Sequence, residues 1–216
     1  MKNHFSVFLF NAIYDRITRQ HTGRQRSAAP ENRREYFHIK KFFAITLVLS
    51  LVLALPAFAE QSIEAVQMNW SEDAEKAFVD AGFEGDWFTL TLDDVECKAI
   101  IPTGYVLRDA TEEEKAEGVA LLFENETNGG AIVVLDTQLD YENLVEIGSQ
   151  IKEETPDRLV QYAMINGTGA LITGDEETDR MNAIFALGDH RYIQYIFSPV
   201  TGNNDLLALL LASIQF

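Results

Sequence analysis

The sequence predicts an α+β domain, an α/β/α sandwich in which helices cover one mainly antiparallel sheet of about eight strands. Three observations predict it. Short apolar runs occur in pairs joined by turns, capped helical segments separate the pairs, and the late strands are apolar on both sides. The two sides of the last strand are Ile193, Tyr195 and Phe197, and Tyr192 and Ile196. A strand that is apolar on both sides needs a covering layer on each.

The clearest hairpins lie in the last third of the chain. RLVQYAMI and TGALIT flank Asn166-Gly167, a dipeptide suited to two consecutive positive φ angles. RMNAIFAL and RYIQYIFS flank Gly188-Asp189 in the same way. We expect two successive antiparallel pairs here.

Four further strands are expected earlier in the chain. Residues 88–101 alternate apolar and polar on both sides of Asp93-Asp94, which predicts a hairpin that turns there. Residues 119–123 and 131–135 are continuous apolar runs joined by a polar, glycine-containing loop.

Helices are expected where capping residues precede apolar faces. Ser71 caps a helix that ends at Gly82, Thr111 caps a short acidic turn, and Asp140 caps a third helix. A last helix, Asp205–Ile214, is nearly all Leu and Ala. At about 15 Å it is too short to span a bilayer, so we interpret it as a core helix.

The order of these elements resembles the PsbP-like fold, and small exported proteins of unknown function from gut Firmicutes. The similarity is carried by short motifs: MNW at 68–70, GFEG at 82–85, IPTGY at 101–105, ING at 165–167, RYIQYIFS at 191–198 and ASIQF at 212–216. The resemblance implies an accessory or binding protein and supplies no ligand residues, because a shared fold does not carry function.

Residues 40–59 have the three parts of an export signal. Lys40 and Lys41 precede the apolar run Phe42–Leu55, and Ala57-Phe58-Ala59 forms a small-x-small cleavage site. We expect cleavage after Ala59 and an extracellular product. The alternative is an uncleaved anchor, since eighteen uncharged residues reach the lower limit of a spanning helix.

Residues 1–39 show no sustained periodicity, and we expect them to be disordered or not translated. Initiation at Ile39 would give a signal of ordinary length, whereas an unusually long basic leader is the alternative. Residues 60–216 are expected to form a single globular domain.

Composition excludes nucleic acid as a partner. Removing residues 1–59 takes nine of the 17 basic and three of the 34 acidic side chains, which leaves 8 against 31, a net charge of −23. Such a surface repels phosphate backbones and anionic membranes. We therefore expect only the transient signal segment to contact a membrane. The domain is expected to be a monomer.

A catalytic hypothesis rests on the lone thiol and lone imidazole of the expected domain, Cys97 and His190. Cys97 alternates with Val95, Ala99 and Ile101, which predicts a buried, inert side chain. His190 follows a predicted turn. We therefore expect a structural thiol and an unrelated turn histidine, and assign no catalytic residue.

No metal or cofactor site is assigned either. GDEETDR at 174–180 places acids at alternating positions, as a calcium loop does, but Arg180 and Ala186 stand where glycine and glutamate are needed. Solvated loops are the expected structure there, at Asp93-Asp94 and at Glu112–Glu114.

Four aromatic residues could line a ligand groove or fill the core: Tyr105, Tyr162, Tyr192 and Trp87. Core packing is the expected role of these rings, since covered sheet faces need large apolar side chains. The abundance of acids makes a catalytic carboxylate pair unidentifiable from sequence.

These observations predict an exported, non-catalytic binding or accessory domain whose ligand is a protein, a glycan or a small molecule. Two alternatives from other classes stay open. One is a hydrolase of cell-wall or glycan material that uses unidentified carboxylates. The other is a weak divalent-cation binder.

Overall fold

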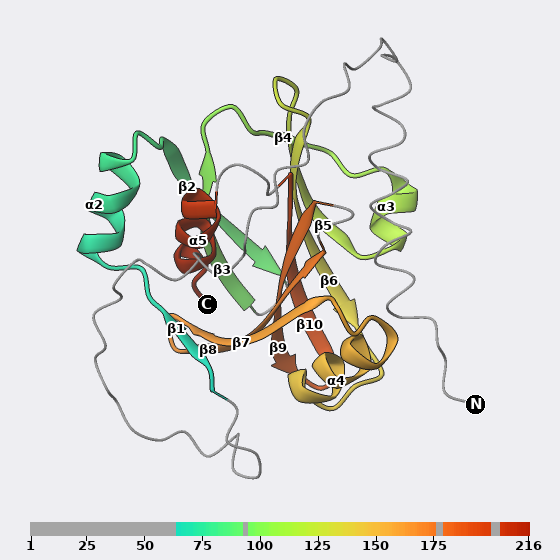
Figure 1. Cartoon of the computed structure of the whole chain (residues 1–216). Helices are drawn as coiled ribbons and strands as arrows, with labels where there is room; N and C mark the ends of the chain where they lie inside the picture. The colour runs from blue at the N-terminus through green and yellow to red at the C-terminus, as the bar shows by residue number, and fades with distance from the viewer. Residues whose placement is uncertain (1–63, 93–94, 176–178, 200–203) are drawn as a thin grey trace, which may run out of the picture. The chain divides into compact units, whose positions relative to one another are not determined.

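A computed structural model of the chain describes residues 64–92, 95–175, 179–199 and 204–216. The predicted signal segment and Asp93-Asp94 lie outside these ranges. The described elements, labelled in Figure 1, are β1 (Val66–Met68), α2 (Glu72–Asp80), β2 (Gly85–Leu92), β3 (Val95–Pro102), β4 (Val106–Arg108), α3 (Glu112–Ala116), β5 (Val119–Asn125), β6 (Gly130–Gln138), α4 (Leu144–Glu154), β7 (Leu159–Ile165), β8 (Thr168–Asp175), β9 (Arg180–Gly188), β10 (Arg191–Ser198) and α5 (Asn204–Ser213).

Eight of the described strands form one sheet in the order β1-β7-β8-β9-β10-β6-β5-β4. Every described pairing in it is antiparallel except β1 with β7, which is parallel. The expectation of an α+β fold with a mainly antiparallel, eight-stranded sheet is therefore confirmed.

The membership of the sheet differs from the prediction. The hairpin expected at residues 88–101 forms, as β2 and β3, but the two strands make a separate two-stranded sheet, which an isolated bridge joins to Gln215. Their places are taken by β1 and β4, which the sequence did not reveal. Each has three residues, too few to show a period of two.

One side of the large sheet packs against the β2–β3 hairpin and α5, which contacts β3. Figure 1 shows α5 beside this hairpin. The side chains that form this core alternate along the strands. They include Phe185, Ile193, Tyr195 and Phe197 from the sheet, Cys97 and Ala99 from β3, and Leu207, Leu210 and Leu211 from α5.

The other side of the sheet packs against α4, which contacts β7, β8 and β9. Leu171, Ile184 and Tyr192 lie one residue out of phase with the first core, and they pack against Leu144 and Ile147 of the helix. Both faces of these strands are therefore buried, as the apolar pattern of the last strand predicted.

Two predicted turns have different outcomes. Asn166 and Gly167 have φ of 48° and 85°, so the predicted turn is confirmed. The β9–β10 turn is centred one residue later than predicted, on Asp189 and His190 with φ of 47° and 60°. Gly188 precedes it and pairs with Arg191, at a shift in the strand register.

Of two predicted helix caps, one is confirmed and one is wrong. Thr111 forms a capping box, in which its side chain and that of Glu114 each accept from the other's backbone N–H. The predicted cap at Asp140 is wrong, because α4 begins later. Its N-cap is Asn143, whose side chain accepts from the N–H groups of Val145 and Glu146.

The side chain of Asn166 joins the two ends of the described domain. Its amide oxygen accepts from Trp70 N–H at 2.7 Å, and its amide nitrogen donates to the carbonyls of Ala212 and Ile214, both at 2.7 Å. The hairpin tip thus fixes the segment after β1 and the end of α5 at one point.

Candidate binding surface

The outer face of the β2–β3 hairpin exposes a tryptophan. In β2, Phe88 and Leu90 point into the core, so Trp87 and its alternating neighbours Thr89 and Thr91 point outward. Trp87 is 43% exposed. We call Trp87, Thr89, Thr91, Glu96 and Lys98, all exposed on this hairpin, the Trp87 surface.

Two neighbouring side chains, Trp70 and Lys98, contact the Trp87 ring and fix its orientation. Trp70 meets it edge to face, with ring centroids 5.6 Å apart and planes at 86°. The Lys98 ammonium lies 5.4 Å from the ring centroid, within cation–π range. An oriented and partly open aromatic ring beside threonine hydroxyls can stack on a ligand and accept or donate hydrogen bonds.

Cys97 is fully buried, as the sequence predicted. The Tyr195 hydroxyl donates to its Sγ at 3.3 Å. Burial raises the pKa of the Cys97 thiol, and the hydrogen bond from Tyr195 offsets this only in part. A buried thiol of raised pKa lacks the thiolate character that a nucleophile needs.

His190 is exposed and has a structural partner. Its Nδ1 lies 2.8 Å from the carbonyl oxygen of Tyr141, which can only accept, so Nδ1 carries the proton. The Tyr192 hydroxyl donates to the same carbonyl at 2.8 Å. His190 therefore fastens the β9–β10 turn to the segment before α4, and its partner is not Cys97.

The acidic run at Glu112–Glu114 forms part of an ion-pair network. Arg108 donates to both Glu114 oxygens, at 2.6 and 3.1 Å, and to Glu124 at 3.0 Å. Burial alone would raise the pKa of Glu114, but hydrogen bonds from Arg108 and Thr111 outweigh it and lower the pKa. Glu114 is thus a structural carboxylate and not the solvated one that was expected.

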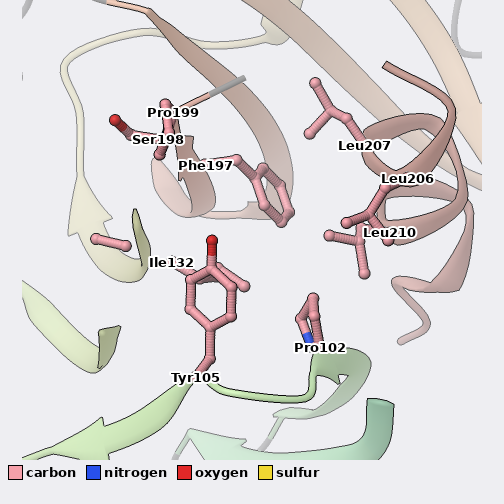
Figure 2. Close-up of a pocket in the computed structure, with 10 residues that line it drawn as sticks. Pro102, Tyr105, Ile132, Phe197, Ser198, Pro199, Leu206, Leu207 and Leu210 are labelled. Atoms are coloured by element: carbon pink, nitrogen blue, oxygen red, sulfur yellow. The ribbon is translucent and has the colours of Figure 1, made fainter. Parts of the chain in front are cut away.

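A small apolar cavity of about 50 Å³ lies between α5 and the ends of β3, β6 and β10. Tyr105 projects into it opposite Phe197, and leucines of α5 line another side (Figure 2). Binding pockets for small molecules are typically about 300 to 1,000 Å³. This cavity has room for one or two water molecules and holds no carboxylate among its lining residues.

The four candidate aromatic residues separate into two groups. Tyr192 is fully buried, and Tyr105 and Tyr162 are half-buried against the two cores, as expected of core residues. Trp87 does not follow that expectation. The alternation that puts Phe88 and Leu90 inside already indicated that Trp87 faces outward, so the signal was present in the sequence.

Residues 64–92, 95–175, 179–199 and 204–216 are the described part of the chain. Within them, no helix is long and apolar enough to cross a membrane. No cluster of three or more His, Cys, Asp or Glu side chains that could hold a metal ion occurs among the described residues. Residues 176–178 of the predicted GDEETDR loop and Asp93-Asp94 lie outside them, whereas Gly174 and Asp175 end β8 and Arg180 begins β9.

No protein-family model matches the chain, and no curated protein sequence matches it. A crystal structure of a protein from Bacteroides thetaiotaomicron VPI-5482 is similar, with a TM-score of 0.36 and 13% sequence identity. The match covers 55% of this chain and 44% of that one, so the chain spans less than half the length of that protein. A similarity this low carries no argument about fold or function.

Proposed function

We propose that this chain is an exported, non-catalytic binding domain that works outside the cytoplasm through the Trp87 surface. The proposal includes signal cleavage after Ala59 and a PsbP-like α/β/α sandwich for residues 60–216. The observation that carries the binding role is the exposed, oriented Trp87 ring. Tryptophan is enriched among the residues that dominate binding energy, and an exposed one held by its neighbours is organised for contact.

The chemistry of the described residues supports binding over catalysis. The two carboxylates with a shifted pKa, Glu112 and Glu114, have it lowered by cationic partners, which is opposite to the shift of a general acid. The thiol is buried and the cavity is small and apolar. No observation on the described part of the chain favours the alternatives, a glycan hydrolase or a weak cation binder.

A thermal-shift screen tests the binding role. The full chain and its Trp87→Ala variant are melted with glycans, peptides, amphiphiles and divalent metals. A ligand of this surface raises the melting temperature of the parent chain and not of Trp87→Ala, since at about 100 times Kd it adds about 2.7 kcal/mol of stability. Val106→Ala is the matched control. Val106 is also exposed, but it lies on β4, an edge strand of the large sheet, and not on the β2–β3 hairpin.

Two results contradict the proposal. A ligand that stabilises the parent and Trp87→Ala equally binds elsewhere, and a ligand that is chemically turned over shows an enzyme. The export part has its own test, N-terminal sequencing of the protein from culture medium. Glu60 is the expected first residue, and an intact leader in a cytosolic pool contradicts export.

A further inference from the structure

The register of the β2–β3 hairpin determines which way the backbone groups of β2 point. Lys98 exchanges two backbone hydrogen bonds with Gln215, each 2.9 Å, so its N–H and C=O point away from β2. Lys98 lies opposite Thr89. Two directly opposed residues of an antiparallel pair either exchange both backbone hydrogen bonds with each other or both direct their N–H and C=O away from the partner strand. Thr89 therefore directs its N–H and C=O away from β3.

A second contact supports this assignment. Ile100 lies opposite Trp87, and its N–H donates to Ser213 Oγ at 3.0 Å instead of to β2. Because the hydrogen-bonding direction repeats at every second residue, Trp87, Thr89 and Thr91 all direct their backbone groups to the outer edge of β2. These are the residues whose side chains form the β2 part of the Trp87 surface.

This edge is open in the described structure. No hydrogen bond joins the outward backbone groups of Trp87, Thr89 and Thr91 to any other described residue. Natural sheet edges are usually shortened, bulged, covered, or marked by lysine or proline. β2 has eight residues, GDWFTLTL, none of them lysine or proline, and it pairs with β3 without a shift in register.

Charge selects the occupant. The exposed acid Asp86 lies in β2, Glu84 directly precedes it, and Glu96 lies opposite Thr91 on the Trp87 surface. The base among the described residues of this hairpin is Lys98, which contacts the Trp87 ring. The whole chain has a formal net charge of −17. Two copies paired through β2 would bring these acids together, whereas a basic strand would complement them.

We propose that the free edge of β2 binds an extended, basic segment of a partner protein, which adds as a further strand beside Trp87. Main-chain hydrogen bonds from Thr89 and its outward neighbours supply affinity, and the Trp87 ring packs on an apolar side chain of the segment. This inference rests on the binding role proposed above and specifies its ligand.

A titration with model peptides tests it. The probes are end-blocked peptides of strand length that alternate lysine with valine, or glutamate with valine. The readout is the fluorescence of the two tryptophans of the chain, Trp70 and Trp87, which both lie at the site. The full chain is compared with Thr89→Pro, which removes the outward N–H, and with Thr89→Val, which keeps it and preserves the side-chain shape.

The lysine peptide is expected to bind Thr89→Pro at least about tenfold more weakly than it binds Thr89→Val, which loses only the side-chain hydroxyl from the Trp87 surface. Added salt is expected to weaken binding. A lysine peptide with N-methylated backbone amides should also bind poorly, and this measurement stands if Thr89→Pro does not fold. Equal binding by Thr89→Pro and Thr89→Val, or by the two peptides, overturns the inference, as does absence of binding to the lysine peptide.

The two proposals fail separately. One outcome is a ligand that raises the melting temperature of Thr89→Pro as much as that of the parent chain, but not that of Trp87→Ala. This result supports the binding surface and overturns strand addition. Sedimentation that shows self-association abolished by Thr89→Pro identifies a second copy as the occupant and overturns the basic partner. A lysine peptide that binds Trp87→Ala and the parent equally overturns both.

Discussion

The β7–β8 and β2–β3 hairpins differ in whether their outer edges are hydrogen-bonded to other strands. The β7–β8 hairpin is paired on both sides, by β1 and by β9, and the Asn166 side chain ties its tip to both ends of the described domain. Among the described residues, the β2–β3 hairpin is bonded on one side by Gln215 and by the Ser213 hydroxyl, and its other edge is open beside an exposed tryptophan.

The difference shows where backbone N–H and C=O groups stabilise the fold and where they are available to a partner. Buried backbone groups must be hydrogen-bonded, and β1 and β9 supply partners to residues 163–165 of β7 and 170–175 of β8. An open edge adds no stability, but it can accept another strand. Substitution of Asn166 should therefore lower the stability of the fold, and substitutions at the open edge of β2 should mainly change binding.

Asn166→Ala is expected to have the largest effect, a loss of about 3 kcal/mol in the free energy of unfolding. Three hydrogen bonds are removed at about 1 kcal/mol each, and alanine tolerates a φ of 48° poorly. Urea denaturation measures it. Asn166→Gly separates the two causes, because glycine accepts the φ but makes no side-chain bond.

Asn69→Ala is the matched control for Asn166→Ala, since Asn69 is exposed, and its effect should stay within about 0.5 kcal/mol. A cost below about 1 kcal/mol for Asn166→Ala would remove the contrast between the two hairpins.

Glu114→Gln is expected to cost about 1 to 2 kcal/mol at neutral pH, because it weakens the paired hydrogen bonds from Arg108 and the capping box. The pKa of Glu114 is lowered below its ordinary 4.5 in the folded chain. Its stabilisation is therefore complete above pH 4.5 and is lost as the pH falls through the lower folded value.

Urea midpoints measured across this acid range check the prediction for Glu114. The parent chain and Glu114→Gln should converge in stability as the pH falls below 4.5. A constant difference would show that the charge of Glu114 is not the source of the effect.

Trp87→Ala should cost roughly 1 kcal/mol, the value of its contacts with Trp70 and Lys98, because the ring is only partly buried. Thermal melts measure it. A cost as large as that of Asn166→Ala would make Trp87 a core residue and weaken its assignment as a contact surface.

Thr89→Pro should have the smallest effect on stability, about 0.5 kcal/mol, because the N–H that it removes points outward. Leu90→Pro is the matched contrast. The Leu90 N–H faces β3, so its loss should cost about 3 kcal/mol or more. Similar costs for the two prolines would mean that the register of β2 is assigned wrongly.

Local chemistry explains which elements the sequence predicted. Asn166-Gly167 and Thr111 act through their own backbone neighbours, so their roles are visible in a few residues. The choice between Asp140 and Asn143 as the cap of α4 is a tertiary matter. The carbonyl of Tyr141 is held by His190 and Tyr192 and cannot begin the helix.

The candidate site was predictable only in part. The alternation of β2 places Trp87 on the outer face, but the open edge depends on which strands pair, and that is set by distant partners. Separation of the β2–β3 hairpin from the large sheet is the feature that the pattern of residues did not contain.

Hydrogen exchange of individual backbone amides, followed by NMR on the full chain, tests the open edge of β2 most directly. The amides of Trp87, Thr89 and Thr91 should exchange rapidly, and those of Phe88 and Leu90, which face β3, should be protected. Protection of Thr89 equal to that of Leu90 would show that this edge is already occupied and would contradict its role as a binding site.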